Sequence, residues 1–235
     1  MHIRAFIEEM ERIAPPELAE DFDAGRIGLV VEGKPDIRKV CCALDASARV
    51  AEAAAEAGAE MLVVHHTPIW RPITAVRGGT ARLLRILLAA EMNLYVMHTN
   101  FDLAPGGIND ALAVHLRLGN PERMSCGVVG ECTLTLEEMA REIGGGLRIH
   151  DEIDRLDRIA VVGGSGFDPA LIAEAASLGA DAFLSAELKH SVALESPLPC
   201  IEATHHALEA PGMRMLADRM SWHYIDDAPH VVLLP

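Results

Sequence analysis

The sequence is poor in aromatic and basic residues. Aromatic side chains make up 4% of the 235 residues, and 20 Lys and Arg face 35 Asp and Glu, for a formal net charge of -15. Nucleic-acid-binding proteins draw most of their affinity from basic patches, so this balance disfavours a nucleic-acid partner. It equally disfavours an anionic membrane surface. Because half of the residues are hydrophobic, a sizeable core of aliphatic side chains can still form.

Cysteine pairs and long apolar runs are also missing. The five cysteines stand at positions 41, 42, 126, 132 and 200, without C-x-x-C spacing, which argues against a disulfide scaffold or a Cys-rich zinc site. No apolar run approaches the roughly 18 residues of a membrane span. The first ten residues carry acidic side chains and lack the basic and apolar regions of a signal peptide. We therefore expect a cytoplasmic protein with reduced thiols.

A strand–helix–strand pattern occurs twice. In the first copy a buried strand at 40–44 precedes a helix at 48–57 and a strand at 61–64, with Asp45 or Ser47 as the candidate helix cap. The second copy has the same order of elements, at 159–162, 170–178 and 182–185. A crossover this short predicts a right-handed parallel strand pair in each copy.

The two copies align at a spacing of 121 positions. Gly58-Ala59-Glu60 matches Gly179-Ala180-Asp181, which indicates either an internal duplication or two ordinary units that resemble each other by chance. We predict an α/β fold of two related domains, at 1–120 and 121–235, with largely parallel strands flanked by helices. The C-terminal strand could join the first domain, and the Gly- and Pro-containing segment 119–127 is the candidate linker.

Three clusters of histidine and carboxylate residues each follow a predicted strand. They are His65-His66, the segment 98–102 with His98 and Asp102, and the segment 205–209 with His205 and Glu209. Ligands of open parallel sheets gather at the carboxyl ends of the strands, where all three clusters are expected.

The composition of these clusters favours a metal site. His205 and Glu209 are four residues apart, so on a helix they share one face and can reach the same ion. Imidazole and carboxylate together suit zinc, iron or manganese. Five ligands (His65, His66, Asp102, His205 and Glu209) exceed the needs of one tetrahedral ion and fit two divalent ions per chain that share a carboxylate. A single histidine in a sheet is more often a structural residue, but three clusters at strand ends are hard to explain in that way.

A glycine-rich turn, Gly163 to Gly166, lies between a predicted strand and a predicted helix. That position suits either a phosphate-binding loop or a simple tight turn. Because the turn lacks both common phosphate-loop patterns, the tight turn is favoured.

The sequence resembles the GTP cyclohydrolase I type 2 homologue family, also called the Nif-three-like or dinuclear metal centre family. The matching segments cover nearly the whole chain: RIGLVVEG, KVCCALDAS, GAEMLVVHHTPIW, VMHTNFDLAPGGINDALA, AVVGGSG, GADAFLSAELKH and ATHHALEAPGMRMLADRM. The resemblance places the family's metal ligands on the same five residues and puts His98 close to the metals. It also implies a homohexamer with the metal sites facing an inner cavity.

The family name implies hydrolytic opening of the guanine imidazole ring of GTP, with release of formate. We expect a metal-dependent hydrolase acting on a small molecule such as a nucleotide or a related heterocycle, with His98 and Glu187 as candidate catalytic proton carriers. The alternatives are a metal-dependent phosphoesterase or amidohydrolase, and a metal-binding regulatory or scaffold protein without turnover.

Overall fold

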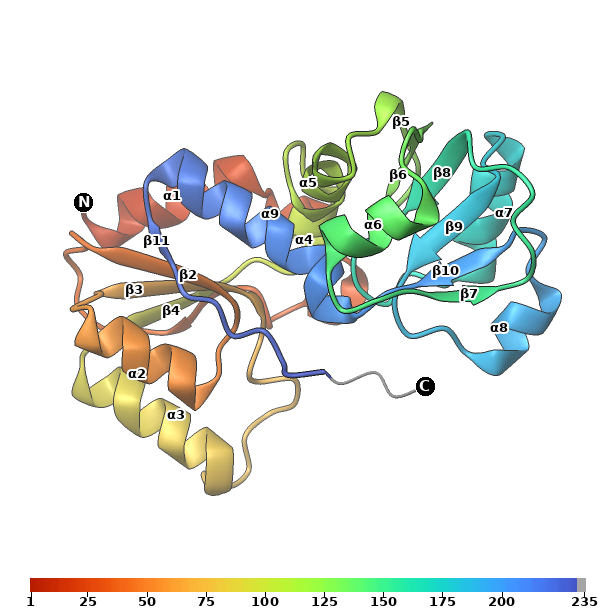
Figure 1. Ribbon diagram of the computed structural model, residues 1–235. Helices are drawn as coiled ribbons and strands as arrows, with labels where there is room; N and C mark the ends of the chain where they lie inside the picture. The colour runs from red at the N-terminus through yellow and green to blue at the C-terminus, as the bar shows by residue number, and fades with distance from the viewer. Residues whose placement is uncertain (232–235) are drawn as a thin grey trace. The chain divides into compact units, whose positions relative to one another are not determined.

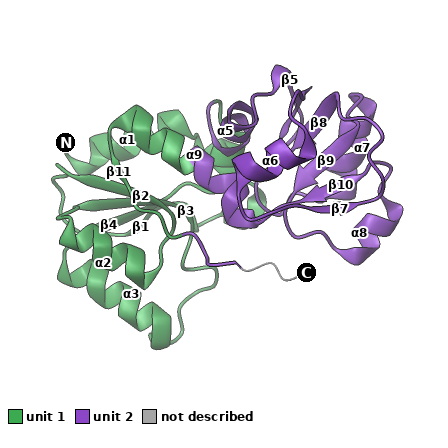
Figure 2. Ribbon diagram, in the orientation of Figure 1, with its two compact units in different colours: residues 1–105, 213–227 green, residues 106–212, 228–235 purple. Residues whose placement is uncertain are grey.

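A computed structural model describes residues 1–231 and confirms an α/β protein with two mixed sheets flanked by helices. The chain forms two compact units, coloured separately in Figure 2. The first comprises residues 1–105 and 213–227, and the second comprises residues 106–212 together with the C-terminal segment from 228. Figure 1 labels their helices and strands.

The first unit contains a five-stranded sheet in the order β1-β4-β3-β2-β11. Its strands are β1 (Gly28–Val31), β2 (Val40–Asp45), β3 (Met61–His66), β4 (Asn93–Val96) and β11 (His223–Tyr224). All neighbours are parallel except β1, which pairs antiparallel with β4. Since β2, β3 and β4 run the same way, their carboxyl ends meet at one edge of the sheet.

The helices of the first unit follow from its sequence patterns. They are α1 (Ile3–Ile13), the short 3-10 turns η1 (Pro16–Leu18) and η2 (Asp21–Asp23), α2 (Ala48–Glu56), α3 (Gly78–Ala89) and α4 (Thr99–Leu103). Ser47, rather than Asp45, caps α2: its side chain accepts a hydrogen bond from the backbone N–H of Val50.

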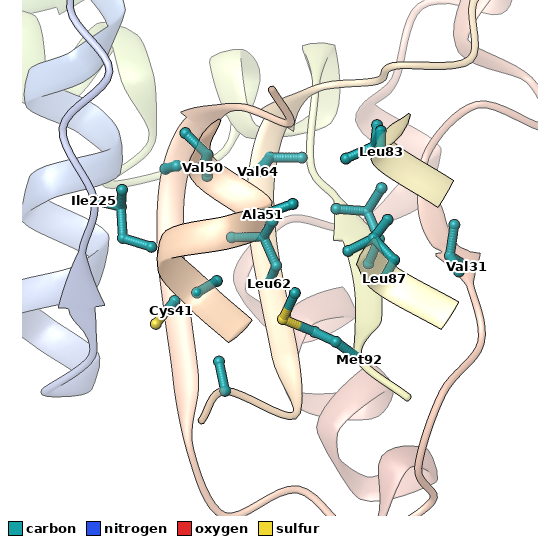
Figure 3. Close-up of a cluster of buried hydrophobic side chains, with 14 of the residues drawn as sticks. Val31, Cys41, Val50, Ala51, Leu62, Val64, Leu83, Leu87, Met92 and Ile225 are labelled. Atoms are coloured by element: carbon teal, nitrogen blue, oxygen red, sulfur yellow. The ribbon is translucent and has the colours of Figure 1, made fainter. Parts of the chain in front are cut away.

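Along each strand of the first sheet, alternate residues face the helices on the two opposite sides of the sheet. Leu62 and Val64 of β3 pack with Ala51 of α2 and Leu87 of α3, in the cluster drawn in Figure 3. On the other face, the ring of Tyr95 meets Phe6 of α1 edge to face at 6.0 Å. The two-residue period of the strands therefore gives this sheet a core on both sides.

The second unit contains a six-stranded sheet in the order β5-β6-β8-β9-β10-β7. Its strands are β5 (Gly119–Arg123), β6 (Val128–Glu131), β7 (Arg148–His150), β8 (Arg158–Val161), β9 (Ala182–Ser185) and β10 (Cys200–Glu202). Only β8, β9 and β10 are parallel to one another. The remaining pairings are antiparallel, so the expectation of largely parallel strands holds for the first sheet and is wrong for the second.

Helices again cover both faces of this sheet. They are α5 (Ile108–His115), α6 (Leu136–Ile143), α7 (Pro169–Ser177), α8 (His190–Glu195) and the first turns of α9 (His205–Met220). One core cluster joins α5 and α6 to inward residues of β6, β8, β9 and β10, and a second joins α7 to the opposite face.

The strand–helix–strand copies have matching local structure. Gly58 and Gly179 end their helices in the left-handed region, at φ +73° and +77°. The Glu60 carboxylate accepts the N–H groups of Arg38 and Lys39, at 2.7 and 3.0 Å. At the aligned position, Asp181 accepts the N–H groups of residues 157 and 158, both at 2.9 Å. These shared hydrogen bonds support an internal duplication over chance similarity.

The boundaries of the compact units differ from those of the domains expected at 1–120 and 121–235. Helix α5 packs on the second sheet through Leu112 and Leu116, so the second unit begins at Gly106. The expected linker 119–127 instead contains β5, an edge strand of that sheet. The chain returns to the first unit at Met213, within α9, and β11 then pairs with β2. Residues 232–235, the end of the domain predicted at 121–235, lie outside the described residues.

Among the described helices, none has both the length and the apolar character needed to cross a membrane.

Asn93 holds together three backbone segments of the first unit. Its buried amide accepts from the N–H of Gly33 at 2.8 Å and donates to the carbonyls of Lys34 and Glu60 at 2.8 and 2.9 Å. Asn93→Leu leaves all three backbone groups without this partner, so we expect a loss of about 2–4 kcal/mol in the free energy of unfolding. Urea denaturation measures it. Glu8→Leu, at an exposed position in the middle of α1, should change the midpoint little; equal losses would contradict this role of Asn93.

Candidate metal centre

Three histidines converge at the carboxyl edge of the first sheet. His65 and His66 end β3, and His98 follows β4, the neighbouring parallel strand. One ring nitrogen from each lies within 4.8 Å of the other two. Asp102, one turn beyond His98 in α4, places Oδ1 3.5 Å from Nε2 of His65. The first unit thus brings together all four ligand and catalytic candidates that its sequence contains.

Each of these imidazoles is held through its Nδ1 atom. Nδ1 of His65, which is fully buried, lies 2.7 Å from the carbonyl oxygen of Met97. Since a carbonyl only accepts, Nδ1 of His65 carries a proton, and in the neutral imidazole the lone pair is then on Nε2. Nδ1 of His66 lies 2.8 Å from Asp45, its neighbour across the β2–β3 register.

His98 is held by a fully buried carboxylate. Nδ1 of His98 lies 2.9 Å from both oxygens of Asp23, which also accepts the backbone N–H and the hydroxyl of Thr99. Burial of the His98 ring lowers its pKa, and the nearby His65 lowers it further, while the hydrogen bond to Asp23 acts in the opposite direction. The lowered pKa favours the neutral imidazole, which is the form that binds metals or accepts a proton.

In the second unit a histidine and a glutamate pair at the start of α9. Nε2 of His205 lies 3.0 Å from Oε2 of Glu209, four residues along the helix. Nδ1 of His205 lies 2.7 Å from Oε1 of Glu187. Glu187, proposed from the sequence as a proton carrier, follows β9 with a left-handed backbone (φ +62°). Such a conformation is uncommon away from glycine.

The donor chemistry of both clusters fits a divalent metal. Metal-binding histidines almost always donate their second ring N–H to a carboxylate or a backbone carbonyl, which fixes the tautomer and raises ligand basicity. His65, His66, His98 and His205 all have such a partner at Nδ1. The buried His, Asp and Glu clusters of this chain are therefore consistent with metal binding.

Comparison with known proteins agrees with this chemistry. Residues 1–232 match the family described as Duf34/NIF3 (NGG1p interacting factor 3). The chain belongs to the Duf34/NIF3 family. This confirms the family that the sequence motifs indicate.

Relatives align with this Duf34/NIF3 chain over nearly their whole length. The "GTP cyclohydrolase 1 type 2 homolog" of Streptomyces coelicolor is 33% identical over 92% of this chain and 87% of its own. The structure described as "Reduced HcgD from Methanocaldococcus jannaschii" has 30% identity and a TM-score of 0.80, covering 95% of this chain and 96% of that one. The structure of "protein ybgI, unknown function" has 26% identity and a TM-score of 0.86, covering 98% and 99%.

Sequence reasoning overlooked two of the three carboxylates that hold the histidines, Asp45 and Asp23. The sequence pattern offers Asp45 only as a candidate helix cap, although its place at the end of a strand, parallel to the strand that ends in His66, is a signal that identifies it. Asp23 lies 75 residues from His98 in the sequence, and no pattern connects the two.

The glycine-rich turn of this Duf34/NIF3 chain borders the His205–Glu209 pair. The N–H groups of Gly163 and Gly166 donate to the side chains of Asn109 and Ser185, both at 2.8 Å. A Cβ on Gly164 would lie 2.2 Å from Oε1 of Glu209 and 3.2 Å from Nε2 of His205. The turn is therefore a tight turn that leaves room for these two side chains, and two of its amides already have protein acceptors.

We expect Gly164→Ala to remove bound metal in addition to lowering the thermal stability. Gly164 has φ +65°, so alanine there carries a backbone penalty of about 1–2 kcal/mol, and its methyl group displaces the flexible end of Glu209. Gly179→Ala is the matched control, because Gly179 has φ +77° and open space around its Cα. We expect similar thermal destabilisation of the two variants but loss of bound metal only in Gly164→Ala, measured by elemental analysis. Equal metal content in the two variants would contradict the role of Gly164.

Proposed function

We propose that this protein is a metal-dependent hydrolase that acts on a nucleotide or a related heterocycle. The observation that carries the proposal is the fixed Nδ1 partner of all four candidate histidines. A structural histidine also hydrogen-bonds a ring nitrogen, but four imidazoles held in this way beside the ends of parallel strands form the arrangement that a metal site requires. The proposed ligands of two divalent ions, of iron, zinc or manganese, are His65, His66, Asp102, His205 and Glu209.

Divalent ions at such a site lower the pKa of water and polarise the bond to be cleaved. The chain itself supplies the orientation of the ligands and the movement of protons. The Asp23 carboxylate holds the proton on Nδ1 of His98, so Nε2 of His98 is free of it and can accept a proton during hydrolysis. Glu187 holds the His205 ring in the same way, and its exposed carboxylate is the second proton-carrier candidate.

The names of the relatives support the choice of substrate class. The Streptomyces coelicolor and Methanocaldococcus jannaschii proteins are both called "GTP cyclohydrolase 1 type 2 homolog". Opening a purine ring requires an activated water and a proton carrier, which suits the residues described above. The homohexamer remains part of the proposal, and light scattering of the purified chain tests it.

Glu209→Gln should remove most of the bound metal and the activity that depends on it. Glu209 is buried, and glutamine keeps its size while removing the charge that binds a cation. Metal per chain, measured by elemental analysis, and formate release from GTP are the two readouts. The control is Glu137→Gln, at an exposed position in the first turn of α6. Full metal content in Glu209→Gln would mean that the ligand assignment is wrong.

If the unaltered protein binds two ions per chain but releases neither formate, phosphate nor amine from nucleotides, the hydrolase proposal fails. The metal-binding scaffold would then be the remaining interpretation.

Asp23→Asn tests whether His98 moves protons. An amide can donate as well as accept, so it no longer forces the proton of His98 onto Nδ1. We expect kcat to fall by about 10²–10⁴-fold with KM and metal content little changed. Asp21→Asn, an exposed residue of the same 3-10 turn, should have no effect. A fall in metal content without a selective loss of kcat would instead make His98 a metal ligand.

A further inference from the structure

Two exposed aromatic rings lie beside the histidine cluster of the first unit. The chain has only two Trp, two Tyr and five Phe, yet Phe22 and Trp70 are 52% and 45% exposed. We call them the aromatic pair. Their ring centroids are 6.5 Å apart with planes inclined at 39°. Two large rings exposed side by side in a chain so poor in aromatic residues form a candidate contact surface.

The aromatic pair is connected to His98. The Trp70 and His98 ring centroids are 5.2 Å apart, and the Phe22 and His98 centroids are 6.3 Å apart, both edge to face. Phe22 also precedes Asp23, the buried carboxylate that holds His98. Phe22 and the proposed proton carrier are therefore positioned by the same short turn, η2.

The loop holds Trp70 in this exposed position. Nε of Arg26 donates to the backbone carbonyl of Trp70 at 2.8 Å, and its guanidinium carbon lies 5.8 Å from the centre of the Trp70 ring. Arg26 thus fixes the backbone of this loop and adds a cation over the ring. An indole held outward in this way is ready to stack on a flat ligand without further ordering.

We propose that the aromatic pair binds the planar heteroaromatic ring of the substrate by stacking, with Arg26 as the adjacent positive group. The inference rests on the proposed function and specifies its substrate class. Stacking on an aromatic side chain does not depend on charge. It therefore suits a protein with a net charge of -15, which does not attract a phosphate group by its overall field.

Fluorescence gives a direct test, because Trp70 and Trp222 are the only tryptophans in the chain. Trp222 stacks on Phe6, with ring centroids 5.7 Å apart, so replacing either tryptophan leaves the other as a separate reporter. In Trp222→Phe, GMP and AMP should quench the fluorescence of Trp70 to saturation, while ribose 5-phosphate should not. In Trp70→Phe, the same nucleotides should leave the fluorescence of Trp222 unchanged after inner-filter correction.

Equilibrium dialysis with GMP extends the test to the affinity. Trp70→Leu and Phe22→Leu should each raise Kd by about tenfold or more, and Trp70→Phe should retain most of the affinity. The matched control is Ile73→Ala, at an exposed aliphatic residue of the same loop, which should leave Kd unchanged.

The inference is overturned if GMP and AMP do not quench Trp70, or if Trp70→Leu changes the oligomeric mass while leaving the affinity for GMP intact. In the second case the pair would be a contact between copies of this chain. Metal content and formate release, measured on the same variants, separate the two proposals. If GMP quenches Trp70 but no formate is released, this inference holds and the hydrolase proposal fails. If Trp70→Leu releases formate at the unaltered rate, the hydrolase proposal holds and the stacking role fails.

Discussion

The hydrogen bond at Nδ1 is the interaction on which the candidate site depends. A free imidazole exchanges its proton between two nitrogens and rotates about two bonds, so it is a poor ligand until something fixes it. Here the Met97 carbonyl and the carboxylates of Asp45, Asp23 and Glu187 do so for four histidines. Three of these partners come from the ends of parallel strands or the turns that follow them, so sheet register sets the direction of the rings.

Parallel register explains why the same arrangement can form in both units. In the first sheet, Asp45 is opposite His66 across adjacent parallel strands. In the second, Glu187 follows β9 and His205 follows β10, its parallel neighbour. Each pair joins a carboxylate at or just after the end of one strand to an imidazole at or just after the end of the adjacent parallel strand. The two pairs use different strands of the repeated unit, because the spacing of 121 positions aligns His66 with Glu187. The duplication indicated by Glu60 and Asp181 therefore does not by itself account for both pairs.

Sequence reasoning succeeded where one local pattern determines one local structure. The strand Ala182–Ser185 is predicted as it is observed, and Ser47, one of the two candidate caps of α2, is the residue that caps it, because strand burial and capping depend on neighbouring residues. The edge strand β5 was missed because its Gly, Asn and Pro residues favour a turn, and pairing with β6 overrides that preference. Asp23 was missed for a different reason: its role depends on a contact across 75 residues, which periodicity and spacing do not encode.

The carboxylates that hold the histidines favour the binding of a metal ion but oppose the binding of a phosphate-bearing substrate. Their negative charge raises the basicity of the imidazoles and offsets that of a bound cation, which favours metal binding. The same charges, added to a net charge of -15, oppose the approach of a phosphate-bearing substrate. A site of this kind therefore needs a source of substrate affinity other than its overall field. Bound metal charge is one such source, and an exposed indole held in place by Arg26 is another, because stacking acts on the uncharged part of a nucleotide.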